Sequence, residues 1–171
     1  MSRWISTFLV FFLSCLIQTT LWPMMFGDIP APQLWLMIIT YIGIYRQPTE
    51  GLITAYILGY LMTAFTLMPL KIILISVLLV FGVVYLIRSR LFWGGNGYFT
   101  MMVAIALVTH HLGYIFISRF MENNPTGIDF MTRFQQILIT PIFSLIIYKL
   151  LQIHEKKIIH DYVSDPRGVG E

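Results

Sequence analysis

The sequence is poor in charged residues and in cysteine. Only 11% of its 171 residues are Asp, Glu, Lys or Arg, whereas 57% are hydrophobic, and the mean hydropathy is +0.78. These values lie far from the averages of soluble domains. With a single cysteine, Cys15, the chain cannot form an internal disulfide. Cys15 falls in the first apolar segment, where we expect it to be a small buried hydrophobic residue. The composition therefore predicts a protein of the lipid bilayer.

Catalytic and metal-binding patterns are also missing. No Asp or Glu falls inside a long apolar segment, and the sequence contains no Gly-x-Ser-x-Gly, His-Glu-x-x-His or paired-carboxylate motif. A zinc centre needs three or four ligands, which two adjacent histidines and a distant Cys15 do not supply. The net charge of +3 comes from basic residues scattered at segment ends. We therefore expect no enzyme activity, no cofactor, no metal site and no nucleic-acid partner.

Six apolar segments predict an all-α fold, a polytopic bundle of six transmembrane helices. Long uninterrupted apolar runs favour helices over the short alternating strands of a membrane barrel. The predicted transmembrane domain covers residues 1–153, and residues 154–171 form a short cytoplasmic tail that first continues the last helix. The second span is short, so it should either begin early, with Pro32 in its first turn, or lie in thinned lipid. The expected spans are about 4–26, 32–45, 51–68, 72–87, 98–118 and 132–153.

Basic residues predict the orientation of the bundle. Six spans place both termini on one side of the membrane, and eight Lys or Arg residues share that side against three on the other. Cytoplasmic loops carry the excess of Lys and Arg, so both termini are predicted to be cytoplasmic. The eight are Arg3, Arg46, Arg88, Arg90, Lys149, Lys156, Lys157 and Arg167, and the three are Lys71, Arg119 and Arg133. Of these, Arg133 and Lys149 should snorkel at the two ends of the last span.

Small side chains recur at every fourth position of the third span. Gly51, Ala55, Gly59 and Thr63 would form one smooth ridge on a helix whose other positions are bulky. Helices in lipid associate through close backbone approach, which such a ridge permits. We expect this ridge to be a helix-packing seam or a partner interface.

Polar side chains inside the spans form a second pattern. They are expected to face the bundle interior, because an amide or imidazole facing lipid has no partner. The residues are Gln18 in the first span, His110 and His111 in the fifth, and Gln136, Thr140 and Ser144 at four-residue spacing in the last. The histidines leave two interpretations open. They are either neutral groups hydrogen-bonded within the bundle, to Gln18 or Gln136 for example, or they have a proton-transfer or ligand-binding role.

Several of these residues occur in a characteristic order along the chain. Gln18 comes late in the first span, the pair Trp22 and Pro23 closes it, and Pro32, Trp35, Tyr41, Gly59, Gln136 and Pro141 follow. In this order and in length, the chain resembles the rod-shape-determining protein MreD family of bacteria. Members of that family often carry an aspartate shortly after the third-helix glycine, whereas this chain has Thr63 in that region.

The resemblance implies a non-enzymatic, multi-pass protein of the bacterial inner (plasma) membrane. Such proteins belong to the cell-elongation machinery, which inserts lateral-wall peptidoglycan and maintains rod shape. The implied partners are an MreC-like bitopic protein and, through it, a RodA-like glycosyltransferase, a class B penicillin-binding protein and the actin-like MreB.

The resemblance also implies a fold similar to the substrate-binding subunit of energy-coupling-factor transporters, which gives an alternative function in vitamin binding. Such a subunit typically carries an alanine pair in its first helix for docking to a coupling protein. The first span of this chain instead has bulky residues such as Phe8, Phe11 and Phe12. The transporter function is therefore the second of the two hypotheses.

Overall fold

The protein folds entirely into helices where it is described. A computed structural model describes residues 3–66, 68–91, 95–121 and 129–163, and every regular element in these ranges is helical. The predicted all-α class is confirmed. Four helices, Trp4–Phe26, Leu70–Arg90, Gly95–Met121 and Phe130–Ile153, are long and apolar enough to cross a membrane. This confirms the membrane-spanning character that the composition predicts.

The first apolar helix changes its winding partway along. It comprises α1 (Arg3–Leu16), a π-helical turn η1 (Ile17–Leu21) and α2 (Trp22–Phe26). Gly27 ends it at φ +59°, a left-handed conformation that glycine adopts without steric strain. Single π-helical turns inside α-helices are rare and frequently occur at functional sites. This one contains Gln18, a residue of the predicted polar interior.

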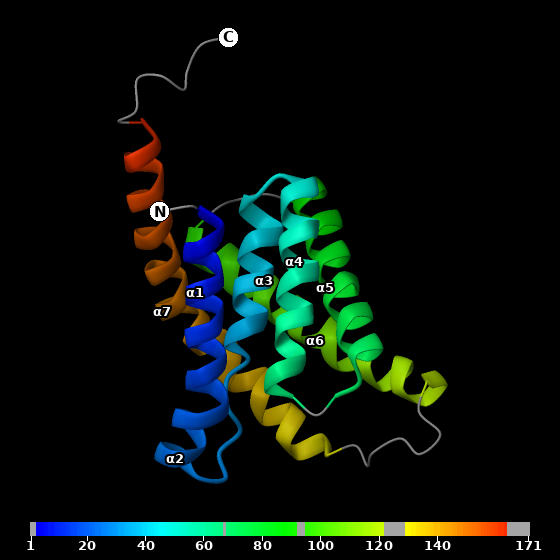
Figure 1. The fold of residues 1–171 in the computed structure, drawn as a ribbon. Helices are drawn as coiled ribbons and strands as arrows, with labels where there is room; N and C mark the ends of the chain where they lie inside the picture. Colours follow the sequence, from blue (N-terminus) through cyan, green and yellow to red (C-terminus); the bar gives the residue numbers. More distant parts are fainter. Residues whose placement is uncertain (1–2, 67, 92–94, 122–128, 164–171) are drawn as a thin grey trace.

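The remaining helices run back and forth alongside the first (Figure 1). They are α3 (Leu34–Tyr45), α4 (Pro48–Met62) with a following 3-10 turn η2 (Thr63–Phe65), α5 (Leu70–Arg90), α6 (Gly95–Met121) and α7 (Phe130–Val163). The start of α1 and the end of α7 lie at the same end of the bundle (Figure 1). The end that holds Phe26, Leu34 and Phe65 is called the far end below.

Helix α3 is the core of the bundle. All of its residues from Leu34 to Ile44 are buried, and it contacts α1, α4, α5, α6 and α7. A helix that is apolar on every side belongs inside a protein. The helix is also shorter than the predicted second span, because Pro32 lies outside it rather than in its first turn. The expectation of an early start is therefore wrong. Because α3 is surrounded by protein, its length need not match the thickness of the lipid.

The predicted small-residue ridge lies between α4 and α5. Gly51, Ala55 and Gly59 are buried in the chain, and we call these three residues the α4 seam. A Cβ atom added to Gly51 would lie 2.9 Å from the Phe81 ring of α5, and one added to Gly59 would lie 3.3 Å from Leu74. At the present helix separation, any larger residue at Gly51 would require the Phe81 ring to move, and one at Gly59 would be tightly packed against Leu74 and Val77.

Thr63 does not belong to this seam. It lies past the end of α4, in the η2 turn, and its hydroxyl donates a hydrogen bond to the Tyr60 carbonyl at 2.7 Å. The predicted four-residue ridge thus has three members in the structure. Because the seam packs within the chain, it is not a free surface for a partner.

Two arginines fix the opposite end of α3, near the start of α1. The buried Arg46 donates a hydrogen bond to the Thr7 hydroxyl and lies 3.5 Å from the carboxylate of Glu50. Arg88 of α5 donates to the Arg46 carbonyl at 2.7 Å and to the Gly43 carbonyl at 3.2 Å. Since the last carbonyls of a helix have no partner within it, Arg88 supplies one. The two arginines tie α1, α3, α4 and α5 together.

Helix α7 begins with a side-chain cap. The Asp129 carboxylate accepts hydrogen bonds from the backbone N–H groups of Met131 at 3.1 Å and Thr132 at 3.3 Å, and from the Thr132 hydroxyl. These bonds hold the pKa of Asp129 below its usual value, and the Thr132 hydroxyl makes the largest contribution. Aspartate is a favoured residue at this position because it satisfies free N–H groups of the first turn.

Candidate functional site

The polar residues of the first and last helices meet at the start of α3. The Gln18 side-chain oxygen accepts a hydrogen bond from the Leu34 N–H at 3.0 Å. The Thr140 hydroxyl accepts from the Gln33 N–H at 3.2 Å. Gln136 accepts from the Gln33 side-chain amide at 3.1 Å and donates to the carbonyl of residue 31 at 3.4 Å. We call this arrangement of Gln18, Gln136, Thr140 and residues 31–34 the α3 junction.

The α3 junction provides hydrogen-bond acceptors for backbone N–H groups at the start of α3. The first N–H groups of a helix have no partner inside the helix, and the Gln33 side chain makes no capping bond at the start of α3. Irregular backbone at membrane depth is tolerated only where protein or enclosed water satisfies it. Side chains from the η1 turn and from α7 supply acceptors for two of these groups, and the Leu34 N–H also bonds to the Pro32 carbonyl at 2.9 Å. The predicted interior residues Gln18, Gln136 and Thr140 are thus brought together by the fold.

Ser144 lies outside the junction. Its side chain is buried, and its hydroxyl lies 3.0 Å from the Thr100 hydroxyl of α6 and 2.6 Å from the Pro141 carbonyl. It therefore fastens α7 to α6 one turn further along the helix.

The residues that carry the family resemblance lie in several different parts of the bundle. Trp22 donates from its indole to the Ile29 carbonyl at 2.9 Å, and Trp35 is buried in the first turn of α3, so both lie next to the α3 junction. Tyr41 instead packs against Phe99 and Tyr148, deeper in the bundle. The others are the exposed Pro23, the buried Pro32 just before α3, the buried Gly59 of the α4 seam and the half-buried Pro141 within α7.

The two adjacent histidines face different neighbours. Their ring centroids are 5.7 Å apart. The His110 ring stands edge-on to Trp35, with 5.1 Å between centroids. His111 Nδ1 lies 3.1 Å from the guanidinium of Arg133, which also lies 4.7 Å from the centre of the Tyr114 ring. The histidines therefore do not share one site.

The structure changes two expectations, one about the partners of the histidines and one about Arg133. Gln18 and Gln136 bind the α3 junction, so neither is the predicted partner of a histidine. Arg133 does not snorkel out of the bundle, because it is half-buried and bonds to His111 of α6. Lys149, by contrast, is exposed as expected. The Arg133 contact joins residues 22 positions apart on two helices, and no local spacing in the sequence signals it.

We predict that an acceptor at position 111 matters more than an imidazole. His111→Leu leaves the half-buried Arg133 without this acceptor and should lower the free energy of unfolding by about 1–3 kcal/mol. His111→Asn places an oxygen near the position of Nδ1 and should retain most of the stability. Thermal unfolding of the purified protein in detergent would measure both. Arg133→Met should resemble His111→Leu, whereas Arg119→Met, at an exposed site on α6, is the control. Equal losses for the Leu and Asn variants would contradict the prediction.

A cavity of about 180 Å³ lies beside the α3 junction at the far end. Its polar lining includes Gln18, Gln33, Ser76 and His110, which come from four different parts of the bundle. Gln33 and Ser76 are not among the predicted interior residues. Each could have been found as a polar side chain inside a predicted apolar span, Gln33 in the second span and Ser76 in the fourth.

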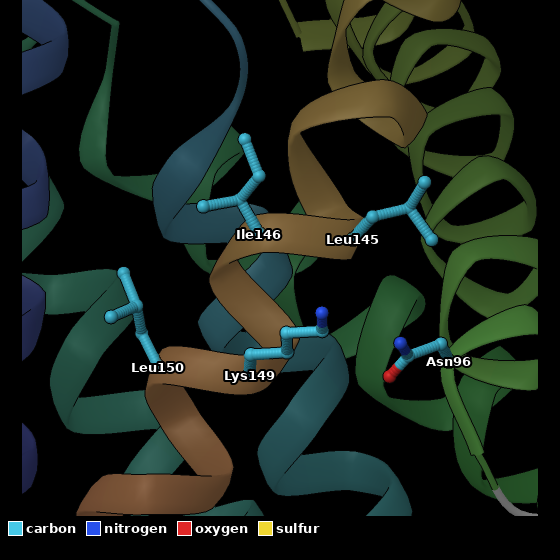
Figure 2. A pocket seen from close by; sticks show the side chains of 5 residues that line it. All are labelled: Asn96, Leu145, Ile146, Lys149 and Leu150. Carbon is cyan, nitrogen blue, oxygen red and sulfur yellow. The ribbon is translucent and has the colours of Figure 1, made fainter.

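A second hollow lies between α6 and α7, nearer the termini. It has a volume of about 550 Å³ and is lined by Asn96, Leu145, Ile146, Lys149 and Leu150. Figure 2 shows Leu145 and Lys149 extending from α7 on the side that faces Asn96 of α6. The lining residues given for it are three aliphatic side chains, one amide and one cation, so converging polar groups are few.

Within the described residues, no group of three or more His, Cys, Asp or Glu side chains is placed to hold a metal ion. Comparison with protein-family models, with curated proteins and with solved structures finds no match to this chain.

Proposed function

We propose that the protein is an MreD-like subunit of the bacterial cell-elongation machinery. In this proposal it crosses the inner membrane six times, with α3 and α4 as the second and third spans and both termini in the cytoplasm. It has no reaction of its own. It holds an MreC-like bitopic protein and, through it, the RodA-like glycosyltransferase, the class B penicillin-binding protein and MreB.

The α3 junction is the observation that carries this proposal. Gln18 and Gln136, two polar residues of the family-like pattern, use their side chains on the backbone around the start of α3. Of the two, only Gln18 also lines the far-end cavity. A family-like residue pattern that serves to build a rigid bundle supports a scaffolding role better than a catalytic one.

The internal position of the α4 seam limits where a partner can bind. Partners must contact surfaces that face the lipid, and the first and last long helices have the least of their length covered. In their most apolar windows, 17% of residues are buried in Trp4–Phe26 and 22% in Phe130–Ile153, against 39% in Leu70–Arg90 and 44% in Gly95–Met121. A single transmembrane helix of a bitopic partner would find an apolar surface on either.

Depletion of the protein in its native cell tests this function. The expected result is loss of rod shape, with rounded cells, together with loss of co-purification between the bitopic partner and the synthases. Re-expression of the wild-type chain is the control and should restore both. Rods that keep their normal shape after complete depletion would refute the proposal.

A vitamin-binding subunit of an energy-coupling-factor transporter is the second candidate. The cavity at the far end favours it, because a substrate site would lie on the side of the membrane opposite the cytoplasmic termini. However, the cavity volume of about 180 Å³ is below the roughly 300–1,000 Å³ that is typical of sites for drug-sized ligands. Mass spectrometry of the purified protein decides between the two, since a transporter subunit should carry a bound vitamin and its depletion should leave rods unchanged.

A further inference from the structure

We propose that the far-end cavity binds a small uncharged solute of the amide or alcohol class. Three side-chain atoms in its lining are buried without a hydrogen-bond partner in the described part of the chain: Gln33 Oε1, Ser76 Oγ and His110 Nδ1. They come from three separate places, namely the residue before α3, helix α5 and helix α6. This inference goes beyond the proposed scaffold function and does not depend on it.

The burial of these groups requires an explanation. The exposed fraction is 1% for Ser76, 7% for His110 and 9% for Gln33. Most buried polar groups in proteins have a partner, and leaving one unpaired costs about 1–3 kcal/mol. Three unpaired groups around one space are explained most simply by a common ligand. Because the Gln33 oxygen can only accept, that ligand must donate a hydrogen bond.

The lining also determines the charge and the size of the ligand. Among the described residues, no Asp, Glu, Lys or Arg lines the cavity, so a charged ligand at membrane depth would lack a counter-charge there. The volume of about 180 Å³ is below the roughly 300–1,000 Å³ that is typical of sites for drug-sized ligands. The solute is therefore a neutral molecule smaller than a drug-sized ligand.

An amphiphilic molecule fits this cavity better than a cluster of waters. Apolar side chains form much of the wall, including Trp35, Met62, Phe65, Met68 and Ile73. Waters can pair with the three polar groups but gain nothing from the apolar part of the wall. A short amide or alcohol would place its polar end at Gln33, Ser76 and His110 and its carbon atoms against the apolar wall.

Fluorine NMR of the full-length protein in detergent, with trifluoroacetamide as the probe, tests the proposal. The probe signal should broaden and shift in a saturable way, and unlabelled acetamide should reverse the effect. Ser76→Ala should weaken binding about 3- to 10-fold, which is the value of one hydrogen bond. Ser118→Ala is the matched control and should bind as the wild type does, because Ser118 is a buried serine of α6 outside the cavity lining whose hydroxyl bonds to Ile115.

His110→Phe provides a second variant if Ser76→Ala folds poorly, and it should also weaken binding. Three outcomes would overturn the proposal: no saturable effect with the wild-type protein, unchanged binding in both cavity variants, or a high-resolution structure in the presence of acetamide that shows only waters in the cavity. None of these measurements involves cell shape or a partner protein. Failure of this inference can therefore be distinguished from failure of the proposed function.

Discussion

Replacing Gly59 with leucine should prevent α4 and α5 from packing at their present distance. Even a single Cβ atom there would lie 3.3 Å from Leu74 and 3.4 Å from Val77, and leucine adds three further carbon atoms. Overpacking in a close-packed interior typically costs about 1–3 kcal/mol, and occasionally more. We expect a lower thermal midpoint and a smaller yield of monodisperse protein. Gly51→Leu should have an even larger effect, because the Phe81 ring lies 2.9 Å from the added Cβ.

Gly82→Leu is the matched control for these variants. Gly82 lies in α5, and a Cβ added to it meets no atom within 4 Å. This variant should fold as well as the wild type. The same stability in all three variants would show that the α4 seam does not govern packing. A Gly59→Leu protein that folds normally but no longer co-purifies with the proposed MreC-like partner would instead make the seam a partner interface.

The second large effect is expected at the α3 junction. Thr140→Val removes the acceptor of the Gln33 N–H, which leaves a buried backbone donor unpaired and should lower the free energy of unfolding by about 1–3 kcal/mol. Gln18→Leu removes one acceptor of the Leu34 N–H, which also bonds to the Pro32 carbonyl at 2.9 Å, so its loss of stability should be smaller. The effects should not be additive in the double variant, since both donors belong to one short segment. Unfolding in detergent, followed by circular dichroism, would measure all three.

Thr54→Val is the control for the loss of a buried hydroxyl. Thr54 is fully buried, but its hydroxyl bonds to the Glu50 carbonyl one turn earlier in its own helix. Its replacement leaves no backbone N–H without an acceptor and should change stability little. If Thr140→Val were no more destabilising than Thr54→Val, the hydrogen bonds of the α3 junction would not be important for the fold.

Local sequence patterns anticipate the helices more accurately than the contacts between them. Apolar runs without acidic residues are enough to place the long helices, because the bilayer admits little else. The end of α4 is less predictable. The apolar pattern continues beyond Met62, yet the α-helix stops there and a 3-10 turn follows. Thr63 therefore falls outside the seam that its spacing suggests.

The α3 junction is formed by hydrogen bonds between residues far apart in the sequence, which a local sequence pattern cannot predict. Gln33 and Gln136 are 103 positions apart, and Gln33 and Thr140 are 107 apart. The sequence places Gln136 and Thr140 on one side of a helix, but it does not say which backbone they satisfy. The short second span is a sign of this arrangement, since a helix of 12 residues is too short to cross lipid unaided and must be enclosed by longer neighbours.

The π-helical turn of the first helix sets the angular phase between its two halves. Each residue of an α-helix advances about 100° around the axis, so a turn that holds one extra residue rotates everything before it relative to everything after it. Thr7 lies before this turn and meets Arg46, whereas Gln18 lies within it and meets Leu34. Thr7 and Gln18 are eleven residues apart, so regular α-helical winding already places them within about 20° of each other, on one side of the helix. The π-helical turn instead changes the direction of the residues that follow it, such as Trp22, whose indole bonds to the Ile29 carbonyl just before α3.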